Sequence, residues 1–164
     1  MKIQHLISSY TRYNLWANET LCSWLKGHGN SLLYQQTPSS YPTIDRTLQH
    51  MIHAQNYWLA VITKSDLSKL DETIKDNMVD VVIDELNAGA QKMVEVYSNY
   101  TEEELSERVK TTDMIQSRAF LIMHAINHNS YHRGQIITMC RILGLTKNIP
   151  STDFDVFLWT EFKS

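Results

Sequence analysis

The sequence predicts an all-α fold, a four-helix bundle with a short C-terminal helix, and three observations support this prediction. The 164 residues include only 5 glycines and 3 prolines, the residues that most often interrupt helices. No alternation of apolar and polar residues, the pattern of a half-buried strand, persists along the chain. Apolar residues recur instead every three or four positions over four long segments, which is the spacing of amphipathic helices around one core.

Signals that start and stop helices separate these periodic segments. The first segment ends at the sequence Gly-His-Gly-Asn, a typical helix C-terminus. Thr43 is a suitable N-cap for the second segment, and Gly144 ends the fourth. A polar stretch at residues 102–113 is either a short hairpin or an irregular loop. We therefore predict long helices at residues 3–26, 43–63, 77–99 and 116–143, and a short terminal helix at residues 152–162.

Composition and charge limit the functions that the chain can have. Hydrophobic residues make up 43% of it and charged residues 20%, as in globular proteins, and one domain accommodates residues 1–164. A net charge of −3 argues against nucleic acid or an anionic membrane as a partner. Cys22 and Cys140 are either a disulfide of a secreted protein or two reduced, buried thiols. We expect two reduced, buried thiols. We also expect the protein to be soluble and cytoplasmic.

Three of the seven histidines follow one another at intervals of four in the last long helix. A helical projection places His128 and His132 in the middle of the apolar face of this helix, and His124 at its edge. In the second helix, His50 shares a side with apolar residues, whereas His53 borders the polar side. His50 is therefore the better candidate to point toward a neighbouring helix.

Imidazoles with this spacing can bind a metal ion. Rings at positions i and i+4 of a helix stand one above the other and can hold one ion between them. A third imidazole from another helix leaves coordination positions open, which is typical of catalytic sites. The alternative is structural, because buried histidines also hydrogen-bond to tyrosine, asparagine or backbone groups. The spacing and inward orientation of these histidines agree with both a metal site and a structural role.

A resemblance to a known family bears on this choice. The sequence NHNSYHRGQII at residues 127–137 resembles the signature of the DinB-like (DinB/YfiT) family of metal-dependent bundle proteins. The similarity extends to YNLWANETL, TLQHMIHAQNYWL and IPSTDFDVFLW, at residues 13–21, 47–59 and 149–159. The resemblance thus covers most of the chain, with its motifs in the expected order.

The resemblance implies an up-down-down-up bundle, usually paired as a homodimer. It also implies a divalent metal ion, such as Zn, Ni, Fe or Mn, bound by three histidines, which by position are His50, His128 and His132. Some family members are transferases that use a low-molecular-weight thiol as cosubstrate. Family members often carry an acidic residue where this chain has Gln55, which leaves an acid-base role at this position in doubt.

The residues that follow the last histidine have both functional and structural interpretations. Arg133 is predicted to lie off the core face, where it binds an anionic substrate group or pairs with a nearby carboxylate. Gly134 is expected to permit close helix packing. Gln135 either orients a metal ligand or forms a plain hydrogen bond between helices. Cys140 lies too far along the helix to share the metal easily.

Two kinds of function agree with this sequence. The first is a metal-dependent enzyme, a thiol transferase or a hydrolase, that acts on a small molecule of unknown identity. The second is a non-catalytic metal-binding or ligand-binding bundle in which the metal is structural. A metal with displaceable water and thiol-dependent turnover distinguishes the first from the second.

Overall fold

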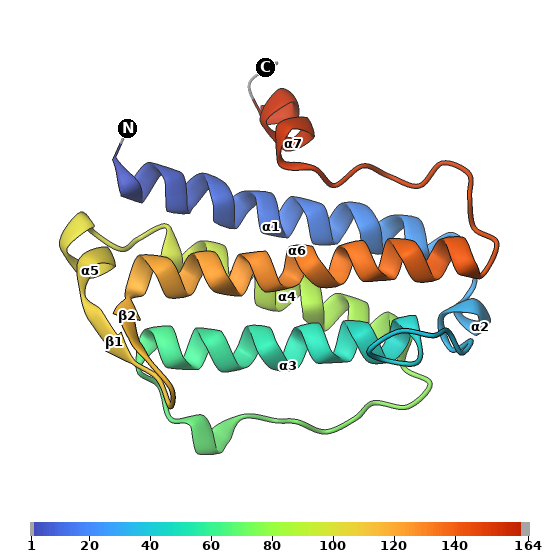
Figure 1. Cartoon of the computed structure of the whole chain (residues 1–164), viewed down its shortest axis with the longest axis horizontal. Helices are drawn as coiled ribbons and strands as arrows, with labels where there is room; N and C mark the ends of the chain where they lie inside the picture. The colour runs from blue at the N-terminus through green and yellow to red at the C-terminus, as the bar shows by residue number, and fades with distance from the viewer. Residues whose placement is uncertain (1, 162–164) are drawn as a thin grey trace.

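The computed structural model describes residues 2–161, which form a helical bundle and one small two-stranded ribbon (Figure 1). The predicted all-α fold is confirmed. The four long helices are α1 (Ile3–Lys26), α3 (Ile44–Thr63), α4 (Val79–Tyr97) and α6 (Arg118–Ile142). The short elements are α2 (Asn30–Leu33), the 3-10 helix η1 (Leu67–Lys69), α5 (Glu102–Ser106), β1 (Arg108–Lys110), β2 (Ile115–Ser117) and α7 (Phe154–Glu161).

Polar side chains define where several of these elements begin. The Thr43 hydroxyl accepts a hydrogen bond from the Arg46 backbone N–H, as predicted for an N-cap. Thr101 and Glu104 form a reciprocal capping box at the start of α5. Of the two alternatives predicted for the polar stretch at residues 102–113, the hairpin is the one observed after α5, because β1 and β2 pair antiparallel. The predicted terminal helix is α7, and residue Phe162, which the prediction included, lies outside the described residues.

The long helices are arranged up-down-down-up, as the resemblance implied. Figure 1 shows α1 and α6 running in one direction and α3 and α4 in the other. Because α3 and α4 are parallel, the segment that joins them, residues 64–78, runs back along the length of the bundle. Helices α1 and α3 each pack against both α4 and α6. The two predicted histidine-bearing helices, α3 and α6, are therefore antiparallel neighbours.

The core has two apolar halves separated by a buried polar layer. One half contains the N-terminal part of α1 and the C-terminal part of α4, and the other half contains the opposite ends of these helices. Each half excludes water from tightly packed aliphatic and aromatic side chains, and this burial is the main favourable term in folding. The polar layer between them consists of buried side chains from α1, α3 and α6: Asn14, Asn18, Gln55, Asn129 and Arg133.

Two further predictions concern the exterior of the protein and its cysteines. None of the helices in the described part of the chain combines the length and hydrophobicity that crossing a bilayer requires. Cys22 and Cys140 are both buried and unpaired, as expected. Burial raises the pKa of the Cys22 thiol to about 12 and that of Cys140 to about 11, so both stay protonated and unreactive near neutral pH.

Candidate metal centre

Three histidines from two helices converge in the seam between α3 and α6. The Nε2 atom of His128 lies 3.3 Å from that of His50 and 3.2 Å from that of His132. All three residues offer ligand atoms within 4.8 Å of one another. These are the three histidines that the sequence predicted, and the antiparallel packing of α3 on α6 brings them together.

The spacing of the nitrogen atoms fits a small divalent ion. In a tetrahedral site with metal–nitrogen bonds of about 2.0 Å, two ligand nitrogens stand about 3.3 Å apart. The two Nε2–Nε2 distances above have this value. Neutral imidazoles that turn unprotonated nitrogens toward one another repel each other, and a cation between them removes the repulsion. The donor set therefore suits Zn²⁺ and other first-row divalent ions.

Two of the rings have a hydrogen-bond partner on the side that faces away from the cluster. The Oε1 atom of Gln135 lies 2.7 Å from Nδ1 of His132, and Oε1 can only accept, so Nδ1 carries the hydrogen. The hydroxyl of Tyr41 lies 2.7 Å from Nδ1 of His50, and its ring stacks on the imidazole at a centroid distance of 4.4 Å. The Gln135 contact therefore leaves Nε2 of His132 with a free lone pair directed at the cluster. The Tyr41 hydroxyl can donate or accept, and Nε2 of His50 has its lone pair free when the hydroxyl accepts. Partners of this kind fix ring orientation in known metal sites.

Burial keeps the cluster neutral. Removal from water lowers the pKa of His50 to about 4, with smaller contributions from His132 and His53. Burial also lowers the pKa of His128 to about 4, and it lowers that of His132, against a raising effect of the Gln135 hydrogen bond. A neutral imidazole is the form that binds metal, so all three rings are ready to act as ligands near neutral pH.

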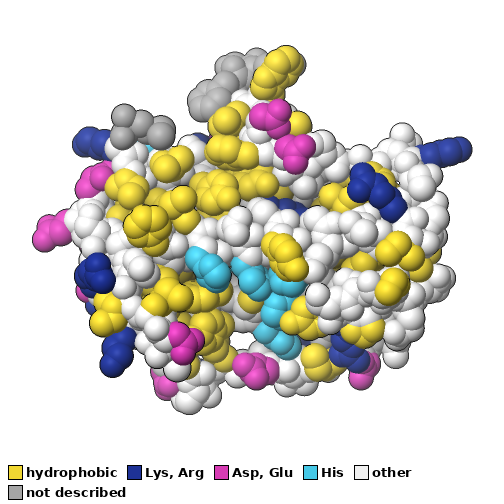
Figure 2. Space-filling model, viewed as in Figure 1, with side chains coloured by type: hydrophobic (Ala, Val, Ile, Leu, Met, Phe, Trp, Pro, Cys, Tyr) yellow, Lys and Arg dark blue, Asp and Glu magenta, His cyan; other side chains and the backbone are white. Residues whose placement is uncertain are grey.

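The cluster is accessible from one side. His132 is only 5% exposed, whereas His50 and His128 are half-buried. Figure 2 shows histidine side chains, in cyan, at the surface along the seam between α3 and α6. Within residues 2–161, the group holds three protein ligands and no carboxylate or thiol joins it. Three ligands and one open side are the arrangement of catalytic sites, whereas structural zinc sites are closed by four.

The other two histidines near the site lie beside the cluster. His124 is exposed one turn before His128, and its ring packs edge-on against Trp58 at a centroid distance of 4.7 Å. His53 lines a pocket that also contains His50, Tyr41 and Arg46. Neither is among the residues that could hold an ion together. The predicted assignment of His50 rather than His53 to the cluster agrees with this geometry.

The predicted position of Arg133 is wrong. Its side chain is 1% exposed and points into the polar layer between α6 and α1, not off the core face. The guanidinium donates to Oδ1 of Asn14 at 2.9 Å and to Oδ1 of Asn18 at 2.8 Å, and it lies 5.3 Å from the centre of the Tyr13 ring. Among the described residues its hydrogen-bond partners are neutral side chains, and no ion pair with a carboxylate forms there. Burial lowers its pKa from the ordinary value.

The prediction that His128 and His132 lie in the middle of the apolar face of α6 is also wrong. The buried face of α6 is wide because both α1 and α3 pack on it, and its centre follows Ile122, Ile126, Asn129 and Arg133. The two histidines lie at the edge of this face that α3 covers. This position explains how they can reach His50 and still remain partly open to solvent.

Gly134 was predicted to permit close helix packing, but the glycine that does so is Gly89. A Cβ atom on Gly134 would meet nothing within 4 Å, so no neighbour requires glycine there. A Cβ atom on Gly89 of α4 would instead lie 2.1 Å from Nε2 of Gln55. Gln55 is buried there, donates to the Leu86 carbonyl at 3.2 Å and accepts from Asn129 at 3.4 Å. At this position the chain thus uses a structural amide within the polar layer.

Sequence reasoning missed Tyr41. It lies in the connector before α3, a segment without periodicity, and its contact with His50 depends on how that connector folds back over the helix. The amide nitrogen of Gln135 donates to the hydroxyl of Ser40, 3.4 Å away, so the same connector is linked to both helices of the cluster. A tyrosine beside the N-cap of the histidine-bearing helix was the only available signal.

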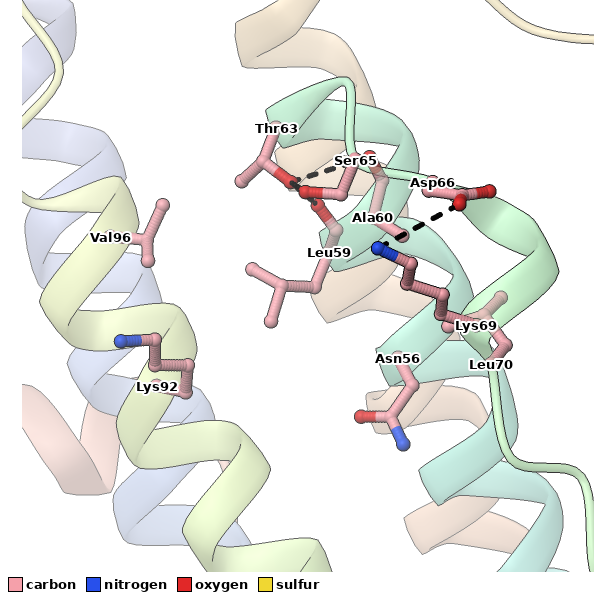
Figure 3. Close-up of a pocket in the computed structure, with 10 residues that line it drawn as sticks. All are labelled: Asn56, Leu59, Ala60, Thr63, Ser65, Asp66, Lys69, Leu70, Lys92 and Val96. Carbon is pink, nitrogen blue, oxygen red and sulfur yellow. Dashed lines mark hydrogen bonds and ion pairs between the residues drawn. The ribbon is translucent and has the colours of Figure 1, made fainter.

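A separate groove lies on the other side of α3. It has a volume of about 620 Å³ and runs between α3, η1 and α4, with Leu59 and Val96 facing each other across it (Figure 3). Its two cations are already paired, Lys69 with Asp66 and Lys92 with Glu95. No histidine or cysteine is among the residues that line the groove, and the histidine cluster lies on the α6 side of α3.

An up-down-down-up bundle with three converging imidazoles defines a class of small helical protein with a potential trihistidine centre. The model of the DinB family matches residues 1–162, and the chain belongs to this family. It is 27% identical over 157 residues to Protein DinB of Bacillus subtilis (strain 168), and the match covers 90% of each chain.

Two solved structures share the fold. A DinB-like protein from Bacillus cereus ATCC 10987 superposes with a TM-score of 0.67 at 20% identity, covering 82% of this chain and 89% of the other. A DinB-like protein from Bacillus subtilis superposes with a TM-score of 0.62 at 16% identity, covering 92% and 96%. At these identities the comparison supports the architecture and carries no statement about activity.

Proposed function

We propose that the protein binds one divalent metal ion through the Nε2 atoms of His50, His128 and His132. The observation that carries this proposal is the convergence of three imidazoles whose ligand atoms lie within 4.8 Å of one another, with two of the rings held from behind by Gln135 and Tyr41.

We further propose that the site is enzymatic, of the thiol-transferase or hydrolase type, with a small-molecule substrate. A metal ion held there would lower the pKa of a bound thiol or water and so supply a nucleophile near neutral pH. The protein's own contribution is to keep the three imidazoles neutral, to hold the rings of His132 and His50 from behind and to leave one side of the cluster accessible. The open side favours this function over a structural metal, which proteins enclose completely.

Metal analysis of the purified protein, followed by cobalt substitution, tests both proposals. We expect about one ion per chain, a visible Co²⁺ spectrum, and a change in that spectrum when a small thiol is added. Turnover that requires both metal and thiol would establish the transferase, and turnover with water alone the hydrolase. A bound ion whose spectrum ignores thiols and other small ligands would support the structural alternative.

The remaining proposals concern assembly and location. We propose a homodimer, because Tyr131, Ile142 and Trp159 remain more than half exposed and offer apolar surface for a second chain. Light scattering should then give twice the chain mass of 19.1 kDa. We also propose a cytoplasmic location, which agrees with two unpaired, buried cysteines and is checked by fractionation of the source cells.

A further inference from the structure

An apolar pocket lies farther along the seam that holds the histidine cluster. It has a volume of about 370 Å³, within the usual range for small-molecule sites. Its walls come from α3, from the β1–β2 hairpin and from the first turns of α6: Trp58, Met114, Gln116, Phe120, Leu121 and His124. We refer to these six residues as the Trp58 pocket.

The Trp58 pocket is connected to the cluster through His124. This residue lines the pocket, and its ring centroid is 4.7 Å from that of Trp58 and 6.4 Å from that of His128. On α3, His50 and Trp58 are two turns apart, and the residue between them on the same side is the small, half-buried Ala54. The seam is therefore lined by small or flat side chains between the cluster and the pocket.

The lining of the pocket indicates what it can bind. It contains no charged side chain, and its polar groups are the neutral amide of Gln116 and the imidazole of His124. Phe120 is 64% exposed and Met114 is 49% exposed, although burying such side chains is favourable. Large apolar side chains left in solvent beside a concave surface are typical of ligand sites.

We propose that the Trp58 pocket binds the apolar part of the substrate whose reacting group is held at the histidine cluster. The substrate class is then a small molecule with an uncharged aromatic or short aliphatic group about two helical turns from its reacting end. This inference rests on the proposed function, because it takes the cluster as the place where the reacting group binds. His124 lies where the two parts of such a molecule join and can hydrogen-bond to a polar linkage there.

Hydroxamates of different length test the inference. Acetohydroxamate and a series of phenylalkyl hydroxamates of increasing chain length carry the same metal-binding group, so they differ only in what reaches the pocket. Binding to the Co²⁺-loaded protein is followed by visible absorption. We expect the best phenylalkyl probe to bind about tenfold more tightly than acetohydroxamate, as burial of a phenyl ring predicts.

Substitutions test whether the tighter binding of the phenylalkyl probes depends on the pocket. Phe120→Ala changes a largely exposed side chain and should reduce the advantage about threefold or more, with acetohydroxamate affinity unchanged. Val81→Ala is the control, since Val81 is 45% exposed on α4 and does not line the pocket. This variant should bind every probe as the unmodified protein does.

Each contrary outcome has a distinct meaning. If acetohydroxamate changes the Co²⁺ spectrum but the phenyl group adds no affinity, the pocket inference is overturned and the metal site stands. If no hydroxamate changes the spectrum, the open metal site itself is refuted, and this inference with it. If Phe120→Ala dissociates a dimer and leaves the phenyl advantage intact, the pocket belongs to an interface between two chains and the inference is wrong.

Discussion

Replacing His128 with alanine separates metal binding from folding. The Nε2 atom of His128 lies within 3.3 Å of both other ligand nitrogens, so the substitution removes the central member of the cluster. Its Nδ1 atom is buried and, among the described residues, has no hydrogen-bond partner. The substitution therefore also removes an unsatisfied polar atom, whose burial costs free energy. Because the ring is half-buried, we expect the metal-free variant to lie within about 1 kcal/mol of the metal-free original.

The loss should appear in the stabilisation that metal provides. An ion at a thousand times its Kd stabilises the folded state by about 4 kcal/mol. For a chain of 164 residues, each kcal/mol raises Tm by about 2–4 °C, so the unmodified protein should gain about 8–16 °C. With His50 and His132 alone, affinity should fall enough that the same metal concentration raises Tm by less than about 2 °C.

Thermal unfolding with and without Zn²⁺ measures this difference, and His124→Ala is the matched control. His124 is an exposed histidine one turn away on the same helix and does not belong to the cluster. The control should keep the full gain in Tm. An equal loss in both variants would show that the assignment of ligands is wrong. If the unmodified protein unfolds when its metal is removed and His128→Ala is unfolded as well, the metal is structural.

Four other perturbations have defined outcomes. Gln135→Ala should weaken metal binding about tenfold or more, measured by calorimetric titration, because one ring loses the acceptor that orients it. Gly89→Ala should lower the free energy of unfolding by about 1–2 kcal/mol in urea, since its Cβ would displace the bonded Gln55 amide. Gly134→Ala should raise that free energy by up to about 1 kcal/mol, and loss of stability or of a dimer would mean that a second chain packs there. Burial lowers the pKa values of the cluster histidines from 6.5, to about 4 for two of them, so the unfolded chain binds more protons in that window. The metal-free protein should lose stability as pH falls from about 6.5 to 4, and urea titrations at several pH values that show the reverse would contradict this sign.

The architecture and the cluster could be predicted because both depend on local spacing. Four long periodic segments with few interrupting residues left the chain little alternative to a bundle. An i, i+4 pair and one inward histidine on a second helix then sufficed to name His50, His128 and His132, which lie together. Neither inference needed the relative positions of distant segments beyond the packing of two helices.

Arg133 shows where such reasoning ends. A helix that packs against two neighbours buries two stripes, and a projection that looks for one apolar stripe assigns the charged residue to solvent. Two of the acceptors that make its burial possible, Asn14 and Asn18, lie on α1, and nothing in the spacing of either helix connects them to Arg133. Tyr41 was missed for a related reason, because a connector without periodicity carries no information about what it covers.

His50 and His128, which lie on different helices of the cluster, are 78 positions apart in the chain. An ion bound by His50 and His128 is therefore a reversible cross-link that closes most of the middle of the sequence into a loop. In the chain-entropy description of cross-links, closing a loop of this length is equivalent to about 4.5 kcal/mol. Separation of α3 from α6 would then require release of the ion, even when the rest of the bundle opens. The metal-loaded protein should accordingly exchange the amide hydrogens of these two helices together, and the metal-free protein separately.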